Sequence, residues 1–141
     1  MKHEGIVYDK ASYHEEILPP ELPERQASLH IGVFLGWLIE RGLVGDEIKQ
    51  QFSDEIESFR SGRLSAPDLF AKLGGVLADD MLTDDGNRFA AAYYDRYLRD
   101  YQRTLAPDRS SPYYVDDSRE NYERMRAQID AAFERWQRSR E

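Results

Sequence analysis

His14 is the residue in this sequence best suited to metal binding or acid–base chemistry. It follows Asp9 closely and precedes Glu15–Glu16, and carboxylates beside an imidazole can bind a metal ion or share a proton. The other two histidines, His3 and His30, stand at no spacing typical of a metal motif. A metal site would have to be assembled from residues far apart in the sequence, so we predict a hydrogen-bonded structural role for His14.

The densest acidic cluster consists of Asp79–Asp80 and Asp84–Asp85. An EF-hand calcium loop with Gly86 at its sixth position would place Met81 and Ala92 at ligand positions, which excludes that motif. Acidic residues in the first turn of a helix interact favourably with its dipole. We therefore predict that these carboxylates cap a helix, with a looser magnesium site as the alternative.

Other chemical motifs are absent from the sequence. It contains no nucleophile elbow, no phosphate-binding loop and no dinucleotide fingerprint. It also contains no cysteine, which excludes disulfides, thiolate ligands and a thiol nucleophile. We predict no catalytic residue, no metal and no cofactor, and we expect a binding protein rather than an enzyme.

Tyrosine is the other notable residue type. A stripe with four-residue spacing is typical of the buried face of a helix, and here it contains Phe89, Tyr93, Tyr97, Tyr101 and Leu105. Tyrosine is also enriched at protein interfaces. We predict core packing for the stripe and contacts with a partner for Tyr94, Tyr113 and Tyr114.

The apolar periodicity predicts an all-α single domain of four or five helices, with a minor two-strand element as an option. A central helix near 24–41 should be buried on most faces, with further helices at 46–60, 67–73, 85–105 and from about 118 to 138. Residues 1–23 read as an irregular N-terminal strap, with a short turn or helix at 8–14. Residues 76–82 are ambiguous, and 113–115 could form a short strand.

Gly32 and Gly36 form a G-x-x-x-G pattern in the apolar stretch Ile31–Ile39. This stretch is too short for a membrane span, which needs about twenty apolar residues. The two glycines therefore predict a groove where another helix packs closely.

Four segments together resemble the hallmarks of an uncharacterised bacterial family, a domain of unknown function found in small acidic proteins. They are Tyr8–His14, Phe34–Ile39 together with Gly42–Val44, Asp79–Leu82, and Tyr114–Tyr122. Typical members carry tryptophan in place of Tyr13, and another near residue 118. The resemblance covers most of the chain and implies no activity.

The net charge of −8 argues against nucleic acid as a partner, because a negative surface repels phosphates. No secretory signal is present, so we expect a cytoplasmic protein that is a monomer or a homodimer. Our first hypothesis is an immunity protein that blocks the active cleft of a toxin with an acidic surface. The alternatives are a small hydrolase or metal-dependent enzyme that uses His14 with Asp79 and Asp80, and a homodimeric adaptor that pairs through Trp136. The predicted partner-binding residues are Asp54, Glu55, Asp79, Asp80, Asp84, Asp85, Tyr94, Tyr113 and Tyr114.

Overall fold

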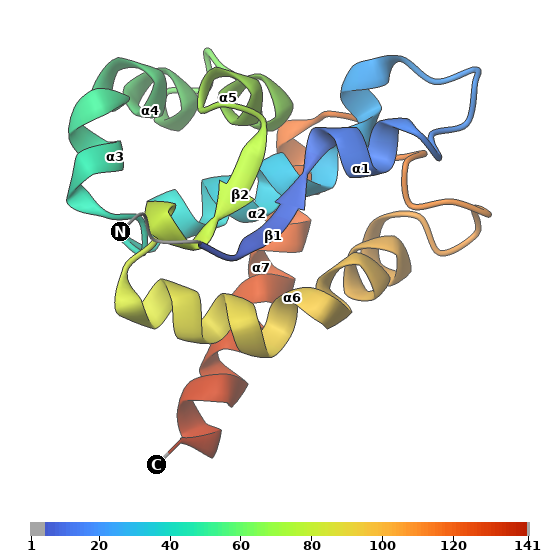
Figure 1. The fold of residues 1–141 in the computed structure, drawn as a ribbon. Coiled ribbons are helices and arrows are strands. Elements are labelled where there is room, and N and C mark those ends of the chain that lie inside the picture. The colour runs from blue at the N-terminus through green and yellow to red at the C-terminus, as the bar shows by residue number, and fades with distance from the viewer. Residues whose placement is uncertain (1–4, 141) are drawn as a thin grey trace.

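The computed structural model describes residues 5–140, so His3 lies outside the described residues. Helices surround one central helix, and a small two-stranded sheet lies at one side (Figure 1). This confirms the predicted all-α fold with a minor two-strand element. The elements are β1 (Val7–Lys10), α1 (Ala11–Glu15), η1 (Glu24–Ala27), α2 (Leu29–Glu40), α3 (Asp46–Gln51), α4 (Ser53–Arg60), α5 (Ala66–Lys72), β2 (Val76–Ala78), η2 (Asp79–Met81), α6 (Asp84–Leu105) and α7 (Arg119–Ser139).

Helix α2 forms the centre of the core. Eleven of its twelve residues are buried, and it packs against α5, α6 and α7. Trp37 is fully buried, and its indole N–H donates a hydrogen bond to Asp130 on α7 at 2.8 Å. The predicted helix at 24–41 is confirmed from Leu29 onward, whereas its first turn is the separate 3₁₀ turn η1.

The G-x-x-x-G groove is confirmed by the contacts of both glycines. A Cβ atom on Gly32 would overlap the backbone carbonyl of Ala66 at the start of α5. A Cβ atom on Gly36 would instead meet the ring of Phe59 on α4. The absence of side chains at these positions therefore lets α4 and α5 approach α2.

Three sequence predictions need correction. Residues 7–10 form a strand, because β1 pairs antiparallel with β2 in the register Val7↔Ala78 and Lys10↔Val76. The predicted helix at 46–60 is broken at Phe52, which has non-helical backbone angles, into α3 and α4. Residues 113–115 do not form a strand, because no other segment pairs with them in the described structure.

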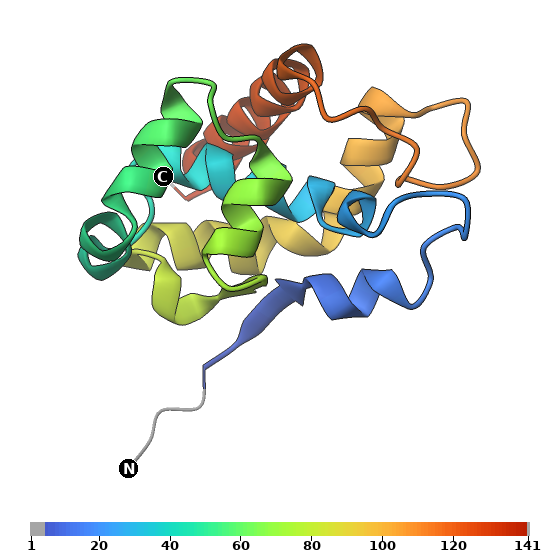
Figure 2. The same ribbon diagram turned by 90° about the horizontal axis from the view of Figure 1, so that it is seen from above.

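The N-terminal segment lies along one side of the body, where β1 leads directly into α1 (Figure 2). Besides its pairing with β2, β1 contacts α6. The N–H of Ala11 donates to the carbonyl of Gly75 at 3.1 Å, which fixes the start of α1. Within residues 5–140, no helix is both long and apolar enough to span a membrane.

Because several tyrosines are buried, we expect the free energy of unfolding to fall in alkaline solution. Burial raises the pKa of Tyr97 and of Tyr101, with nearby tyrosines and Asp117 adding to the respective shifts. The folded state thus keeps the proton that the unfolded state releases above pH 10. At pH 11, each such group should lower the free energy of unfolding by about 1 kcal/mol.

Urea unfolding at pH 7 and pH 11 checks this expectation for Tyr101. Its hydroxyl has no hydrogen-bond partner among the described residues, so Tyr101→Phe should be neutral or slightly stabilising at pH 7. Between pH 7 and pH 11 the free energy of unfolding of the variant should fall by about 1 kcal/mol less than that of the wild type. An equal loss in both proteins would contradict the expectation.

Candidate metal centre

Three potential metal ligands, one each from β1, α1 and α2, lie close together. Nε2 of His14 lies 2.7 Å from Oδ1 of Asp9, and Nε2 of His30 lies 3.4 Å from Oδ2 of the same carboxylate. The two Nε2 atoms are 3.3 Å apart, and the two imidazole rings meet edge to face. One ligand atom can thus be chosen from each residue so that all three lie within 4.8 Å of one another.

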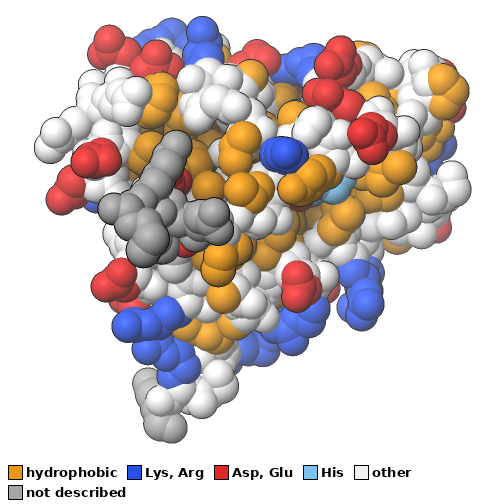
Figure 3. Space-filling view, viewed as in Figure 1, with side chains coloured by type: hydrophobic (Ala, Val, Ile, Leu, Met, Phe, Trp, Pro, Cys, Tyr) orange, Lys and Arg blue, Asp and Glu red, His pale blue; other side chains and the backbone are white. Residues whose placement is uncertain are grey.

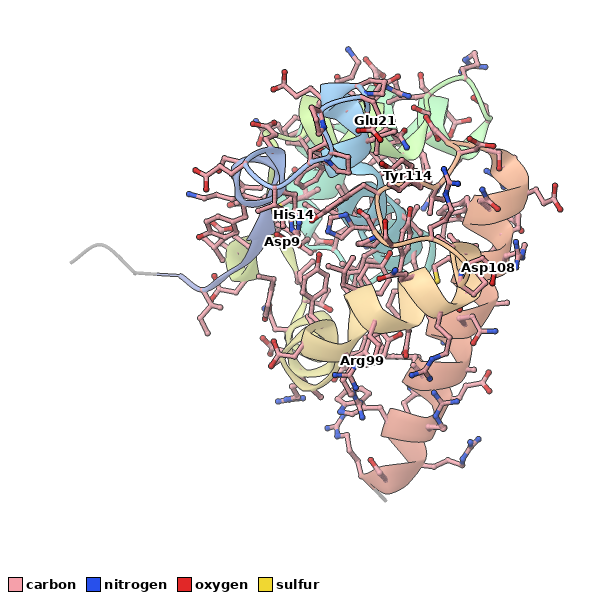
Figure 4. The ribbon with its side chains drawn as sticks, turned by 90° about the vertical axis from the view of Figure 1, so that its right-hand side faces the viewer. Asp9, His14, Glu21, Arg99, Asp108 and Tyr114 are labelled. Atoms are coloured by element: carbon pink, nitrogen blue, oxygen red, sulfur yellow. The ribbon has the colours of Figure 1, made fainter. Side chains whose placement is uncertain are left out.

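The local structure explains how the chain brings these residues together. Asp9 lies in β1, where its side chain is buried against the body. The chain then turns into α1, which carries His14 back over Asp9 (Figure 4). His30 lies in the first turn of α2 and is 2% exposed. A short strand, a short helix and the central helix therefore build the cluster.

Two tyrosine hydroxyls form hydrogen bonds with side chains of the cluster. The hydroxyl of Tyr94 on α6 donates to Oδ2 of Asp9 at 2.6 Å. The hydroxyl of Tyr113 lies 2.6 Å from Nδ1 of His14, and the Gln26 amide holds the Tyr113 backbone by donating to its carbonyl oxygen. Metal-binding histidines and carboxylates usually have such hydrogen-bonded partners, which fix the orientation of the ligand.

The charges in the cluster suit a cation. Burial alone would raise the pKa of Asp9, but hydrogen bonds from His14, His30 and Tyr94 outweigh burial and hold this pKa well below its usual range. Burial also lowers the pKa of His30, against the opposing hydrogen bond to Asp9. At neutral pH the carboxylate is ionised and the His30 ring is neutral, which are the forms that bind a metal ion.

Two of the three distances in the cluster match those between metal ligands. In a tetrahedral zinc site with bonds of about 2.0–2.1 Å, neighbouring ligand atoms lie roughly 3.3 Å apart. The separation of the two histidine nitrogens and that between His30 and Asp9 both agree with this value. The shorter contact between His14 and Asp9 is a hydrogen bond to the other carboxylate oxygen. An ion would replace this hydrogen bond, so the His14 ring and the Asp9 carboxylate would move apart when it binds.

The cluster lies just below the surface. The side chain of His14 is 12% exposed, that of Asp9 is 8% exposed and that of His30 is 2% exposed. In the space-filling view, a histidine side chain is visible between apolar side chains (Figure 3). An ion therefore has a short path from solvent to the ligand atoms.

Residues 7–115 match the model of a family described as a domain of unknown function, DUF7832. The chain belongs to this family. The matched segment contains Asp9, His14, His30, Tyr94 and Tyr113, whereas α7 lies beyond it. No curated protein and no solved structure matches the chain. The expected membership of an uncharacterised family is thus confirmed, and membership brings no activity with it.

The predicted acidic site residues lie on other elements than the three metal ligands. Asp54 and Glu55 are in the first turn of α4, Asp79 and Asp80 are in η2, and Asp84–Asp85 are in the first turn of α6. The last pair confirms the predicted capping position, and Thr83 is the N-cap residue. None of these acids belongs to the metal-ligand cluster in the part of the chain that the structure describes.

The three predicted interface tyrosines have separate surroundings. Tyr94 and Tyr113 point into the cluster, and Tyr113 is only 4% exposed. Their hydroxyls are therefore engaged inside the molecule. Tyr114 is half-buried, and its hydroxyl donates a hydrogen bond to Glu21. Both residues lie apart from Asp9 and His14 (Figure 4).

Sequence reasoning missed the role of His30. This residue begins the long apolar run of α2, where ten of the other eleven residues are buried. A buried imidazole requires polar partners, because an unsatisfied polar group in the core is costly. A histidine within an apolar helix indicates that polar partners lie nearby. In the structure, His14 and Asp9 are these partners.

Proposed function

We propose that this protein binds one divalent transition-metal ion through Asp9, His14 and His30. The observation that carries the proposal is the position of His30 Nε2, which lies 3.3 Å from His14 Nε2 and 3.4 Å from a carboxylate oxygen of Asp9, close to the edge length of a metal coordination shell. The hydrogen bonds from Tyr94 and Tyr113 support it, since they orient two of the three ligands.

The ligand types restrict the class of metal. Imidazole ligands suit zinc, copper, iron and nickel, whereas calcium and magnesium prefer oxygen ligands alone. We take Zn²⁺ as the probe because two histidines and one carboxylate form a familiar zinc ligand set. Three protein ligands leave one coordination position for water or another ligand.

A bound water at this open position would supply the hydrolytic alternative. Zinc lowers the pKa of such a water to about 7, which generates a nucleophile at neutral pH. This form of the metal-dependent enzyme hypothesis uses His14 with Asp9 and His30 in place of Asp79 and Asp80. This hydrolytic alternative is supported by the number of protein ligands, because three ligands leave a tetrahedral ion one position for water.

A metal-loading experiment tests the proposal. Chelator-treated protein is incubated with excess Zn²⁺, passed through a desalting column and analysed for zinc and protein content. We expect one zinc ion per chain. A ratio near zero would refute the proposal, and several ions per chain with no saturating first site would indicate weak surface binding instead.

A protein partner is our second proposal, and exposed apolar side chains favour it. Ile6, Val7, Tyr13 and Ile17 are 43–67% exposed and all lie in the N-terminal segment. Large apolar residues gathered on one surface are typical of interaction sites. An immunity protein that blocks a toxin through this segment and the predicted acidic residues would combine apolar contacts with electrostatic attraction that speeds association.

Co-expression with the product of the adjacent reading frame tests this second proposal. We expect a stoichiometric complex whose association slows as salt rises. Tyr13→Ser should weaken the complex, whereas Arg138→Ser, at an exposed residue of α7 outside the predicted partner-binding set, should not. Recovery of the protein alone, or equal effects of both substitutions, would contradict the proposal.

A further inference from the structure

A groove of about 320 Å³ lies between α6 and the C-terminal half of α7, and none of the metal-ligand residues lines it. Its lining consists of Tyr93, Arg96 and Asp100 on α6 and of Ala132, Arg135, Trp136 and Ser139 on α7. Tyr93 and Ala132 are buried, whereas both arginines are exposed. The volume is at the lower end of the range for small-molecule sites.

The two arginines of this groove form no ion pair with a carboxylate among the described residues. The guanidinium of Arg96 lies 5.7 Å from the centroid of the Tyr93 ring. Burial and the hydrogen bond to Asp100 raise the pKa of Tyr93, and the charges of Arg96 and Arg135 oppose this increase. Both guanidinium groups therefore lie near the same hydroxyl. Two positive charges close together without a counter-charge attract an anion.

The negative charge in the groove is already engaged. Asp100 contributes the single carboxylate of the described lining, and it accepts a hydrogen bond from the Tyr93 hydroxyl at 2.7 Å. Asp95 and Glu134 are exposed on the same two helices but do not line the groove. Lys and Arg side chains also predominate along the lower edge of the space-filling view, on the side where α6 and the end of α7 lie (Figure 3). Because salt screens exposed charges beyond about 10 Å, these nearby groups outweigh the net negative charge of the chain.

We propose that this groove binds a small phosphate ester, whose phosphate group accepts hydrogen bonds from Arg96 and Arg135. The planar guanidinium matches the spacing of phosphate and carboxylate oxygens. A carboxylate has two oxygens, which one guanidinium can occupy, whereas a phosphate ester has three terminal oxygens and can bind both arginines at once. The half-buried ring of Trp136 supplies apolar surface beside them for the organic part of the ligand.

The experiment titrates metal-free protein with three probes in a calorimeter at low salt. Phenyl phosphate carries the ring and the phosphate, benzoate carries the ring with a carboxylate, and inorganic phosphate lacks the ring. The variants are Arg96→Gln, Arg135→Gln and Asp100→Asn. Arg88→Gln is the matched control, because Arg88 is an exposed arginine of α6 that pairs with Asp85 outside the groove.

We expect phenyl phosphate to bind the wild type at one site per chain, and more tightly than benzoate or inorganic phosphate. Arg96→Gln and Arg135→Gln should each weaken its binding by about ten-fold, because each removes hydrogen bonds to a charged group. Asp100→Asn removes a negative charge beside the ligand and should tighten binding by about three-fold. Arg88→Gln should bind like the wild type.

Three results would overturn the proposal. They are the absence of saturable binding of phenyl phosphate, unchanged affinity in Arg96→Gln or Arg135→Gln, and a loss in Arg88→Gln as large as in these variants. Equal affinity for phenyl phosphate and benzoate would overturn the choice of phosphate, and equal affinity for phenyl phosphate and inorganic phosphate would overturn the choice of an ester. Because no metal is added, none of these results depends on the metal centre.

Discussion

Replacement of His30 by glutamine should weaken Zn²⁺ binding by more than about 100-fold. His30 contributes one of three protein ligands, and loss of even an outer hydrogen-bond partner of a ligand typically costs 10- to 100-fold in affinity. Its Nε2 atom faces both His14 and Asp9, so no other described side chain replaces it. Competition titrations against a chromophoric chelator measure the effect.

Asp9→Asn and His14→Gln should have effects of the same size, because the three residues form one ligand set. Asp80→Asn is the matched control, since it removes an exposed carboxylate from η2 outside the cluster. A loss of affinity in Asp80→Asn, or unchanged affinity in His30→Gln, would contradict the assignment of the ligands.

The tyrosine pair at 113 and 114 provides a finer test. Tyr113→Phe removes the hydroxyl that contacts Nδ1 of His14, and we expect zinc affinity to fall about ten-fold. Tyr114→Phe removes a neighbouring hydroxyl that contacts Glu21, so its zinc affinity should equal that of the wild type. Equal affinities in the two variants would show that the Tyr113 hydroxyl does not support the metal site.

Gly32→Ala should lower the free energy of unfolding by about 1–3 kcal/mol, as overpacking of a tight core typically does. Alanine is the better helix former by roughly 1 kcal/mol, but its Cβ would overlap the backbone carbonyl of Ala66. A backbone atom at the start of α5 cannot rotate away as a side chain can. Helix α5 would have to move off α2, and urea unfolding measures the cost.

Gly36→Ala is the matched comparison on the same helix face. Its Cβ would meet the rings of Phe59 and Tyr122, which are side chains that can shift. We therefore expect a smaller loss of stability than in Gly32→Ala. If Gly32→Ala were as stable as the wild type, or less destabilised than Gly36→Ala, the close approach of α5 to α2 would be wrong.

The helices with regular apolar spacing were predictable from the sequence. The four-residue stripe from Phe89 to Tyr101 is buried on α6, and the stripe of Tyr122, Met125, Ile129 and Phe133 is buried on α7. Both helices begin where capping residues stand, at Thr83 and Ser118. Local periodicity and capping are properties of neighbouring residues, so one sequence suffices to read them.

Strand β1 was not predictable in the same way. It has four residues, and its pairing partner β2 is far along the chain. No alternating apolar pattern stands out, because Asp9 is the buried residue of the strand. A charged side chain faces inward here only because His14, His30 and Tyr94 supply hydrogen bonds.

The candidate site was therefore predictable in part. His14 and Asp9 stand close in the sequence and were recognised as a possible pair, but His30, Tyr94 and Tyr113 come from three other segments. Tertiary packing brings these groups together, and no fixed spacing in the sequence predicts their proximity. The acidic residues between 79 and 85 are close together in the sequence, but Asp84 and Asp85 lie in the first turn of α6 and belong to no metal-ligand group among the described residues.

Anomalous diffraction from crystals grown with Zn²⁺ tests the central claim most directly. We predict one strong peak at the zinc absorption edge, about 2.0–2.2 Å from Nε2 of His14, from Nε2 of His30 and from a carboxylate oxygen of Asp9. A map without a peak at this position, or with its strongest peak at the acidic residues 79–85, would contradict the claim that this cluster is a metal centre.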